Sequence, residues 1–211
     1  MPKLQNINVV PLPLDRLETM AEWEQVEQVM QAGAALLAGR TIWDVTSSLY
    51  GEAAELLTSS VAHCTVGGID SRWLVMDGEP EFFVIGKRLD RLLYGMPGDG
   101  GPLGPAEREI YDRTALANAH QLASEVKPGD VVFLHGELAI GMAPGLQGTG
   151  AHVVWLSHVG AERTNEHVRR ALAFLRPGLD AVQRFALSRW PFVPPGIPAP
   201  IVSVIPPRAG P

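Results

Sequence analysis

The spacing of apolar residues along the chain predicts alternating helices and strands. Apolar positions at helical intervals predict helices over residues 14–37, 52–66, 79–94, 105–126 and 164–175. Short apolar runs predict strands at 41–46, 69–76, 131–134, 151–156, 181–187 and 201–205. Segment 95–105 is dense in glycine and proline, and we expect a loop there.

Several of these predicted strands are apolar on both faces, which is typical of a parallel sheet covered by helices on both sides. Their alternation with helices predicts an α/β fold, a single Rossmann-like, doubly wound and mainly parallel sheet. We divide the chain into an N-terminal extension and helix (1–40), a Rossmann-like domain (41–190) and a tail (191–211). The tail is rich in proline, so we expect a stiff, extended connector.

Composition excludes several classes of partner. The net charge is −6 and no run is rich in Lys or Arg, which argues against nucleic acids and anionic membranes. The single cysteine, Cys64, permits no intramolecular disulfide and fits a reducing compartment. Neither a secretory leader nor an apolar run of about 20 residues is present. We therefore expect a cytoplasmic protein.

The candidate chemistry lies just after the predicted strands. In doubly wound sheets the ligand crevice lies beyond the carboxyl ends of the strands. Those positions carry Ser47 to Glu52, Asp77 to Glu81, His135 to Glu137 and Ser157 to Glu162. Their hydroxyl, carboxylate and imidazole groups suit a polyol ligand. No pair of His, Asp or Glu residues has a spacing that indicates a metal site, so we predict none.

A series of short motifs adds a family resemblance to this picture. The motifs are Gly68-Ile-Asp-Ser-Arg-Trp73, Glu81-Phe-Phe83 followed by Lys87, His135, Trp155-Leu-Ser-His158, Phe174-Leu-Arg-Pro177 with Asp180, Phe192-Val-Pro-Pro195 and Ile205-Pro-Pro207. Because these motifs occur in this order, the chain resembles the N-terminal domain of family 4 retaining GT-B glycosyltransferases, of the trehalose synthase and trehalose phosphorylase kind. The resemblance covers roughly residues 40–208.

The resemblance implies retaining transfer of glucose from a nucleotide-sugar, or from trehalose with phosphate, to a sugar acceptor. It implies that this half holds the acceptor and that a second domain holds the nucleotide-sugar, so no cofactor is expected here. His158 is then the catalytic candidate. The substrate-binding candidates are Ser47, Tyr50, Gly51, Glu81, Lys87, His135, Glu137 and Asn165. Helix capping is an equal alternative for Glu81, and a structural hydrogen bond is the alternative for His158.

The chain also departs from the family. Only Gly51 remains of a glycine-rich turn after the first strand, and Tyr50 and Glu52 would crowd a donor phosphate there. Gly136 replaces an aspartate, and Leu156 replaces an arginine. No donor-domain motif is found, so we expect a partner to supply that domain.

Three functional hypotheses follow from these observations. The first is the acceptor-side subunit of a split glycosyltransferase, completed by a partner chain that binds the nucleotide-sugar. The second is a non-catalytic pseudo-glycosyltransferase that stabilises or regulates a full-length relative. The third is a stand-alone sugar- or nucleoside-binding module, or an enzyme of altered chemistry. We expect a glycosyltransferase-like partner chain or a homodimer, since a half-domain of this kind exposes an apolar face.

Overall fold

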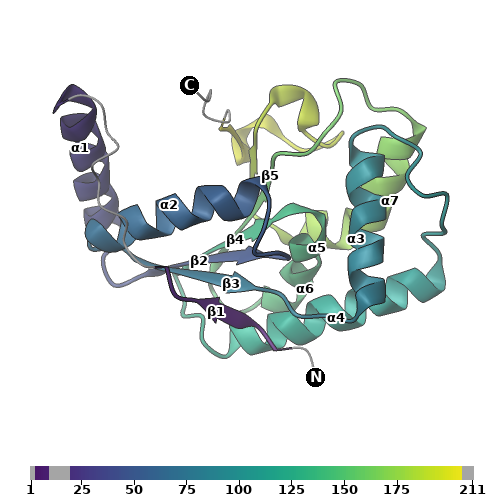
Figure 1. Ribbon diagram of the computed structural model, residues 1–211, viewed down its shortest axis with the longest axis horizontal. Helices are drawn as coiled ribbons and strands as arrows, with labels where there is room; N and C mark the ends of the chain where they lie inside the picture. Colours follow the sequence, from purple (N-terminus) through teal and green to yellow (C-terminus); the bar gives the residue numbers. More distant parts are fainter. Residues whose placement is uncertain (1–2, 10–19, 206–211) are drawn as a thin grey trace.

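A computed structural model describes residues 3–9 and 20–205 of the chain. Within them one sheet contains seven strands in the order β1-β3-β2-β4-β5-β6-β7 (Figure 1). The strands are β1 (Gln5–Ile7), β2 (Thr41–Thr46), β3 (Asp70–Val75), β4 (Val131–His135), β5 (His152–Ser157), β6 (Arg184–Leu187) and β7 (Val202–Val204). Only the pairing of β1 with β3 is antiparallel among these described strands. The predicted α/β fold with a mainly parallel sheet is confirmed.

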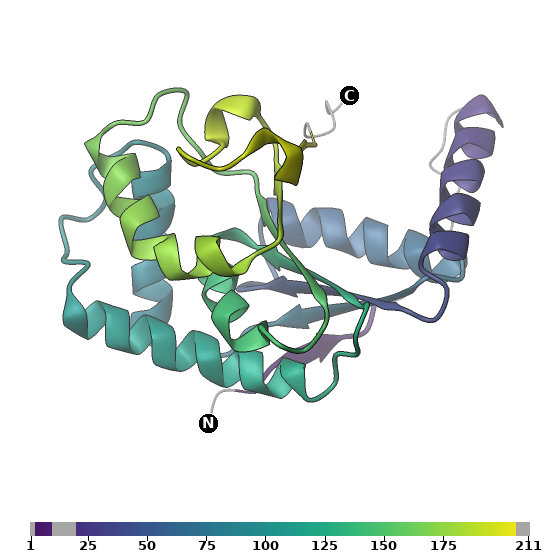
Figure 2. The ribbon, with the colours of Figure 1, turned by 180° about the vertical axis from the view of Figure 1, so that it is seen from behind.

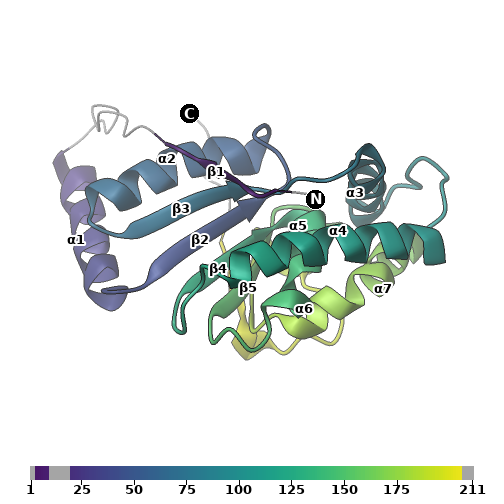
Figure 3. The same cartoon turned by 90° about the horizontal axis from the view of Figure 1, so that it is seen from below.

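Helices cover both faces of the sheet. They are α1 (Met20–Leu36), α2 (Glu52–Val66), α3 (Pro80–Leu93), α4 (Pro105–Ala123), α5 (Gly136–Ala139), α6 (Ala143–Leu146) and α7 (Glu166–Ala181), with 3-10 turns η1 (Ile140–Met142), η2 (Trp190–Phe192) and η3 (Ala199–Ile201). Helix α2 lies on one side of β2 and β3, and α4 and α6 lie on the other (Figures 1 and 3). Helix α1 stands at one end of the molecule (Figure 2).

Alternation of side chains along the strands builds two apolar layers. On β3, Trp73 and Val75 pack with Leu57 and Val61 of α2 in a small cluster. Leu74 belongs to the large cluster on the opposite face. That large cluster also contains Trp43, Val45, Phe82, Leu89, Tyr111, Leu134, Trp155, Phe174 and Phe185.

The strand at 41–46 and the helix at 52–66 have the predicted bounds, and the predicted loop at 95–105 holds until α4 begins. Helices α3 and α4 each begin at a proline, which fits the first turn because no N–H is needed there. The Glu107 carboxylate accepts the Gly104 N–H at 2.8 Å and so caps the amino end of α4. The helix predicted over 14–37 appears as α1, and residues 14–19 lie outside the described residues.

The predicted end of the helix at residue 175 is wrong. Helix α7 continues through Pro177 to Ala181, and the next strand begins at Arg184. Proline removes one helical hydrogen bond, and the Arg108 guanidinium donates to the Phe174 carbonyl in the disturbed turn. The same guanidinium lies 3.7 Å from the centre of the Phe174 ring. A side chain from α4 thus contacts the turn around Pro177, which the local sequence pattern cannot show.

Helical turns between β4 and β5 are also missing from the sequence prediction. Residues 136–146 form α5, η1 and α6, and Leu138, Ile140, Met142 and Leu146 are all buried there. Apart from Glu137 this segment is apolar and mostly buried, so it carries no amphipathic period.

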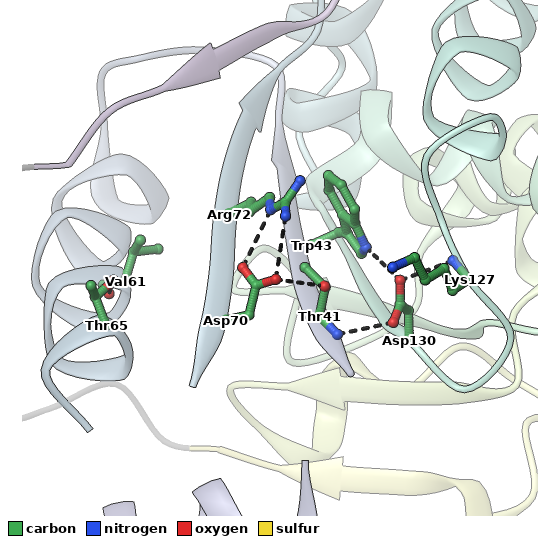
Figure 4. Close-up of polar contacts among 8 residues, drawn as sticks. All are labelled: Thr41, Trp43, Val61, Thr65, Asp70, Arg72, Lys127 and Asp130. Carbon is green, nitrogen blue, oxygen red and sulfur yellow. Dashed lines mark hydrogen bonds and ion pairs between the residues drawn. The ribbon is translucent and has the colours of Figure 1, made fainter. Parts of the chain in front are cut away.

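The amino end of β2 is held by the carboxylate of Asp130, in the loop before β4. It accepts hydrogen bonds from the backbone N–H of Thr41 at 2.9 Å and of Lys127 at 2.9 Å, and from the Trp43 indole at 3.0 Å (Figure 4). These donors favour the ionised form, so the pKa of Asp130 lies below its ordinary value although burial opposes the shift.

Within the described part of the chain, no helix combines the length and the apolar character that crossing a membrane requires.

Candidate functional site

Two adjoining pockets open at the point where the direction of the chain through the sheet reverses. The chain passes from β2 to β3 on one side, and then returns past β2 to β4, β5, β6 and β7 on the other. Strands β2 and β4 therefore flank a topological switch point, the usual ligand position in such sheets. Ser47 follows β2 and Gly136 follows β4 at this edge.

The first pocket, which we call the strand-end pocket, has a volume of about 290 Å³. It lies at the ends of β2, β4 and β5, and its charged or titratable lining residues are Asp90, His135, Glu137 and His158. Ser47 and Tyr50 line it as well. Five sequence candidates, namely Ser47, Tyr50, His135, Glu137 and His158, thus meet in one pocket.

The second pocket, which we call the α3 pocket, has a volume of about 450 Å³. Phe83, Val84, Lys87 and Arg91 of α3 line it. It shares Ser47, Ser48, Asp90 and Glu137 with the strand-end pocket, so the two form one continuous cleft. The cleft has room for a ligand larger than one sugar ring.

A buried pair of polar side chains forms part of the cleft. His135 Nε2 lies 2.9 Å from Asp44 Oδ1, with 8% and 11% of the two side chains exposed. His135 Nδ1 is buried and has no hydrogen-bond partner among the described residues. When the imidazole is neutral, the carboxylate accepts the Nε2 proton, which leaves Nδ1 as a hydrogen-bond acceptor.

Two carboxyl groups on the wall shared by the two pockets are shifted towards their protonated forms. Burial raises the pKa of Glu137 to about 7, and the nearby charge of Asp90 adds to the shift. Burial also raises the pKa of Asp90, while the positive charge of Arg91 opposes that shift. A carboxyl that titrates near neutrality in a cleft is able both to accept and to donate a proton.

His158 lies at the carboxyl end of β5 and is oriented by a neighbouring strand. Its Nδ1 lies 2.6 Å from the Oγ of Ser188, a buried residue directly after β6. The structural hydrogen bond expected as an alternative is therefore present, and His158 lines the strand-end pocket as well. Its catalytic role stays a prediction.

Comparison with known proteins places this geometry in a family. A sequence model described as the N-terminal domain of trehalose synthase matches residues 44–194. The chain belongs to the trehalose synthase N-terminal domain family. It is 26% identical to a trehalose synthase from Rubrobacter xylanophilus over 211 residues, which is 99% of this chain and 49% of the relative. The chain thus spans about half the length of the curated relative it matches.

Solved structures share the fold of this trehalose synthase N-terminal domain. One is described as trehalose-6-phosphate from E. coli bound with UDP-2-fluoro glucose, with a TM-score of 0.55, 11% identity, and 71% of this chain and 40% of that chain covered. Another is an α,α-trehalose 6-phosphate synthase from Burkholderia multivorans, with a TM-score of 0.52, 14% identity, and coverage of 71% and 39%. The fold is that of the N-terminal half of a GT-B glycosyltransferase.

Three candidates of this trehalose synthase-like domain lie outside the two pockets. Glu81 is exposed in the first turn of α3, beside a separate hollow that Glu107 also lines. Gly51 precedes α2 with a φ of 96°. Asn165 caps α7, since its Oδ1 accepts the Val168 N–H at 3.0 Å and its Nδ2 donates to the Gly95 carbonyl at 2.8 Å. Roles for these three in binding substrate stay predictions.

Two residues at or behind the cleft are missing from the sequence candidates. Asp44, the buried partner of His135, is a carboxylate between the apolar residues Trp43 and Val45, which is a signal visible in the sequence. Asp90 lies three residues after Lys87, so both fall on one side of α3. Helical spacing alone could not have identified Asp90 as a cleft residue. It indicates Asp90 only once Lys87 is known to lie at the cleft.

Proposed function

We propose that the chain supplies the acceptor side of a retaining, trehalose synthase-like glycosyltransferase, and that a partner chain supplies the nucleotide-sugar side. The observation that carries the proposal is the cleft at the switch point, where five of the expected residues line one pocket. The family match over residues 44–194 supports the same assignment, because it names the N-terminal domain of such an enzyme.

The chemistry of the strand-end pocket suits an acceptor hydroxyl group. Ser47 and Glu137 offer oxygen acceptors at the ends of adjacent strands, and His135 lines the pocket beside them. In this proposal His158, oriented by Ser188, contacts the sugar at the reacting end of the pocket. Retaining transfer also needs hydrogen-bond donors or positive charges directed at the departing diphosphate. We assign these groups to the partner chain.

The second half of the enzyme is part of the proposal. The curated relative is about twice as long as the region matched, with 49% of it covered. The pockets open at a sheet edge where, in a two-domain enzyme, the partner domain would close over them. We therefore expect neither half to turn over alone.

A direct test begins with sugar binding to the purified chain. Glucose should give saturation-transfer NMR signals with the chain, and His158→Ala should weaken them while circular dichroism stays unchanged. The tagged chain, purified from its host together with its partner, should transfer glucose from a nucleotide-sugar. The same complex carrying His158→Ala should lose most of this activity, on the order of a hundredfold or more. Turnover by the isolated chain would contradict the partner requirement and favour a stand-alone enzyme.

One observation favours the non-catalytic alternative. The turn after β2 carries Tyr50, whose side chain is 86% exposed beside the strand-end pocket, where a glycine-rich turn would leave open space. A regulator would raise the stability or activity of a full-length glycosyltransferase without using its own His158. Full activity of the His158→Ala complex would therefore support this alternative.

A further inference from the structure

The wall between the two pockets carries two carboxyl groups that make no direct ion pair with a described residue. Asp90 of α3 and Glu137 of α5 line both pockets and are half-buried. Neither takes part in an ion pair within the described part of the chain. The basic residues of the cleft, Lys87, Arg88 and Arg91, line the α3 pocket and not the strand-end pocket. Arg88 is already bound to Asp99 at 2.6 Å.

Such an arrangement is costly for the free protein. A carboxylate that leaves water without gaining a partner raises the free energy of the folded state. The pKa values of both groups are raised, that of Glu137 to about 7, which is the electrostatic sign of this cost. Uncompensated groups in a cleft are common where a ligand supplies the missing charge.

A third acceptor lies in the same pocket. The His135 side chain is 8% exposed, and its Nδ1 has no partner in the described residues. The Asp44 carboxylate accepts a hydrogen bond from the other ring nitrogen, Nε2, at 2.9 Å. The strand-end pocket is therefore lined by two carboxyls, with an unpartnered imidazole nitrogen buried in its wall, and these acceptor groups together favour a ligand rich in hydrogen-bond donors.

The missing charge could in principle come from a metal ion. Among the described residues, however, no three His, Cys, Asp or Glu side chains are grouped closely enough to hold one. The volume of about 290 Å³ is instead close to the lower range of small-molecule sites, which suits one ring-sized organic ligand.

We infer that the strand-end pocket selects an acceptor that carries an amino group, an amino sugar or amino-polyol bound as its ammonium form by Asp90 and Glu137. The ammonium protons satisfy the two carboxyls, and the remaining hydroxyls reach His135 and Ser47. This inference rests on the proposed function, because it names the acceptor class of the same site.

Calorimetric titration of the full chain at pH 7 with three probes tests the inference. Glucosamine should bind about tenfold more tightly than glucose, since a charge-assisted hydrogen bond is worth about that factor. N-acetylglucosamine has the same ring without the charge and should show no such gain. Glu137→Gln and Asp90→Asn should each reduce the ratio of the glucosamine to the glucose affinity about tenfold. Glu109→Gln, an exposed α4 acid paired with Arg113, should keep the ratio.

The other results of these titrations would overturn the inference in distinguishable ways. Equal binding of glucose and glucosamine would overturn the inference and leave the proposed function standing, whereas no binding of any of the three sugars would overturn both. Glu137-dependent binding of Mg²⁺ or Ca²⁺ alone would also overturn it in favour of a metal site. If one carboxyl variant fails to fold by circular dichroism, the other variant and the N-acetylglucosamine comparison in the native chain still give the answer.

Discussion

The hydrogen bond between Asp44 and His135 joins the middle of β2 to the end of β4 inside an otherwise apolar sheet. A carboxylate at this depth is tolerated because the imidazole accompanies it. The place of His135 at the end of a predicted strand indicated a functional residue, but the sequence did not indicate Asp44 as its hydrogen-bond partner. Sequence spacing could not supply that partner, since 91 positions separate the two residues and only the pairing of β2 with β4 brings them together.

The raised pKa of Glu137 leads to a pH-dependent stability. Its folded value of about 7 lies above the ordinary 4.5, so the folded state binds more protons between these values. The contribution is fully present below about pH 4.5 and is lost as pH rises through 7. Glu137→Gln should therefore gain stability over the native chain between pH 5 and pH 8, by about 1–3 kcal/mol.

Urea unfolding at pH 5 and pH 8 measures this difference, with Glu109→Gln as the control. Other titrating groups change the free energy of unfolding equally in the native chain and in both variants. The difference in unfolding free energy between a variant and the native chain therefore reports on the substituted residue alone. An unchanged difference between Glu137→Gln and the native chain at the two pH values would show that Glu137 titrates normally.

At the scale of elements, local patterns located most helices and strands, and they failed where a distant contact decides the outcome. Strands at 41–46 and 131–134 could be predicted because buried parallel strands are short apolar runs. The end of α7 could not be predicted, because Pro177 is a local stop signal and yet the helix continues through it to Ala181, and Arg108 of α4 packs against the turn around Pro177. The helical turns at residues 136–146 could not be predicted either, because a mostly buried segment shows no alternation of apolar and polar residues at helical spacing.

Gly178 tests how tightly α7 packs on the turn η1. A β-carbon at this position would lie 2.6 Å from the backbone oxygen of Ile140, which has no freedom to move away. Gly178→Ala should therefore lower the free energy of unfolding by about 1–3 kcal/mol, although alanine normally favours a helix over glycine. Thermal and urea unfolding measure the change.

The matched control is Gly33→Ala in α1. There a β-carbon would meet only the end of the Ile69 side chain, at 3.2 Å, and that side chain can adjust. This variant should be neutral or slightly stabilising. A Gly178→Ala protein as stable as Gly33→Ala would mean that α7 and η1 are packed more loosely than described.

At the scale of the whole molecule, apolar side chains are exposed in and after the turn that follows β2, where Tyr50 borders the strand-end pocket. Tyr50 and Leu49 are 86% and 42% exposed in the turn after β2, and Leu56 of α2 is 42% exposed. Apolar groups that gather beside a site often mark a protein interface. Their location supports the proposed partner, which would cover this edge of the sheet.

We therefore predict that the working form is not a monomer. Light scattering at micromolar concentration should show a dimer of the chain, or a complex when the glycosyltransferase-like partner is present. A double change, Leu49→Ser with Tyr50→Ser, should weaken that association at least tenfold, whereas Val66→Ser at the carboxyl end of α2 should not. A monodisperse monomer that also ignores the partner would contradict the prediction.

The order of the strands has a consequence for how the protein is made. Strands β4, β5, β6 and β7 join the sheet one after another in chain order, so each leaves the ribosome beside an edge that already exists. Strand β1 is different, because its partner is residues 73–75, far downstream. At about 5–20 residues per second, β1 waits several seconds with its backbone unpaired. Strand β2 likewise has no partner until β3 emerges, so the nascent chain carries two unpaired strands through early synthesis, and β3 then pairs with both.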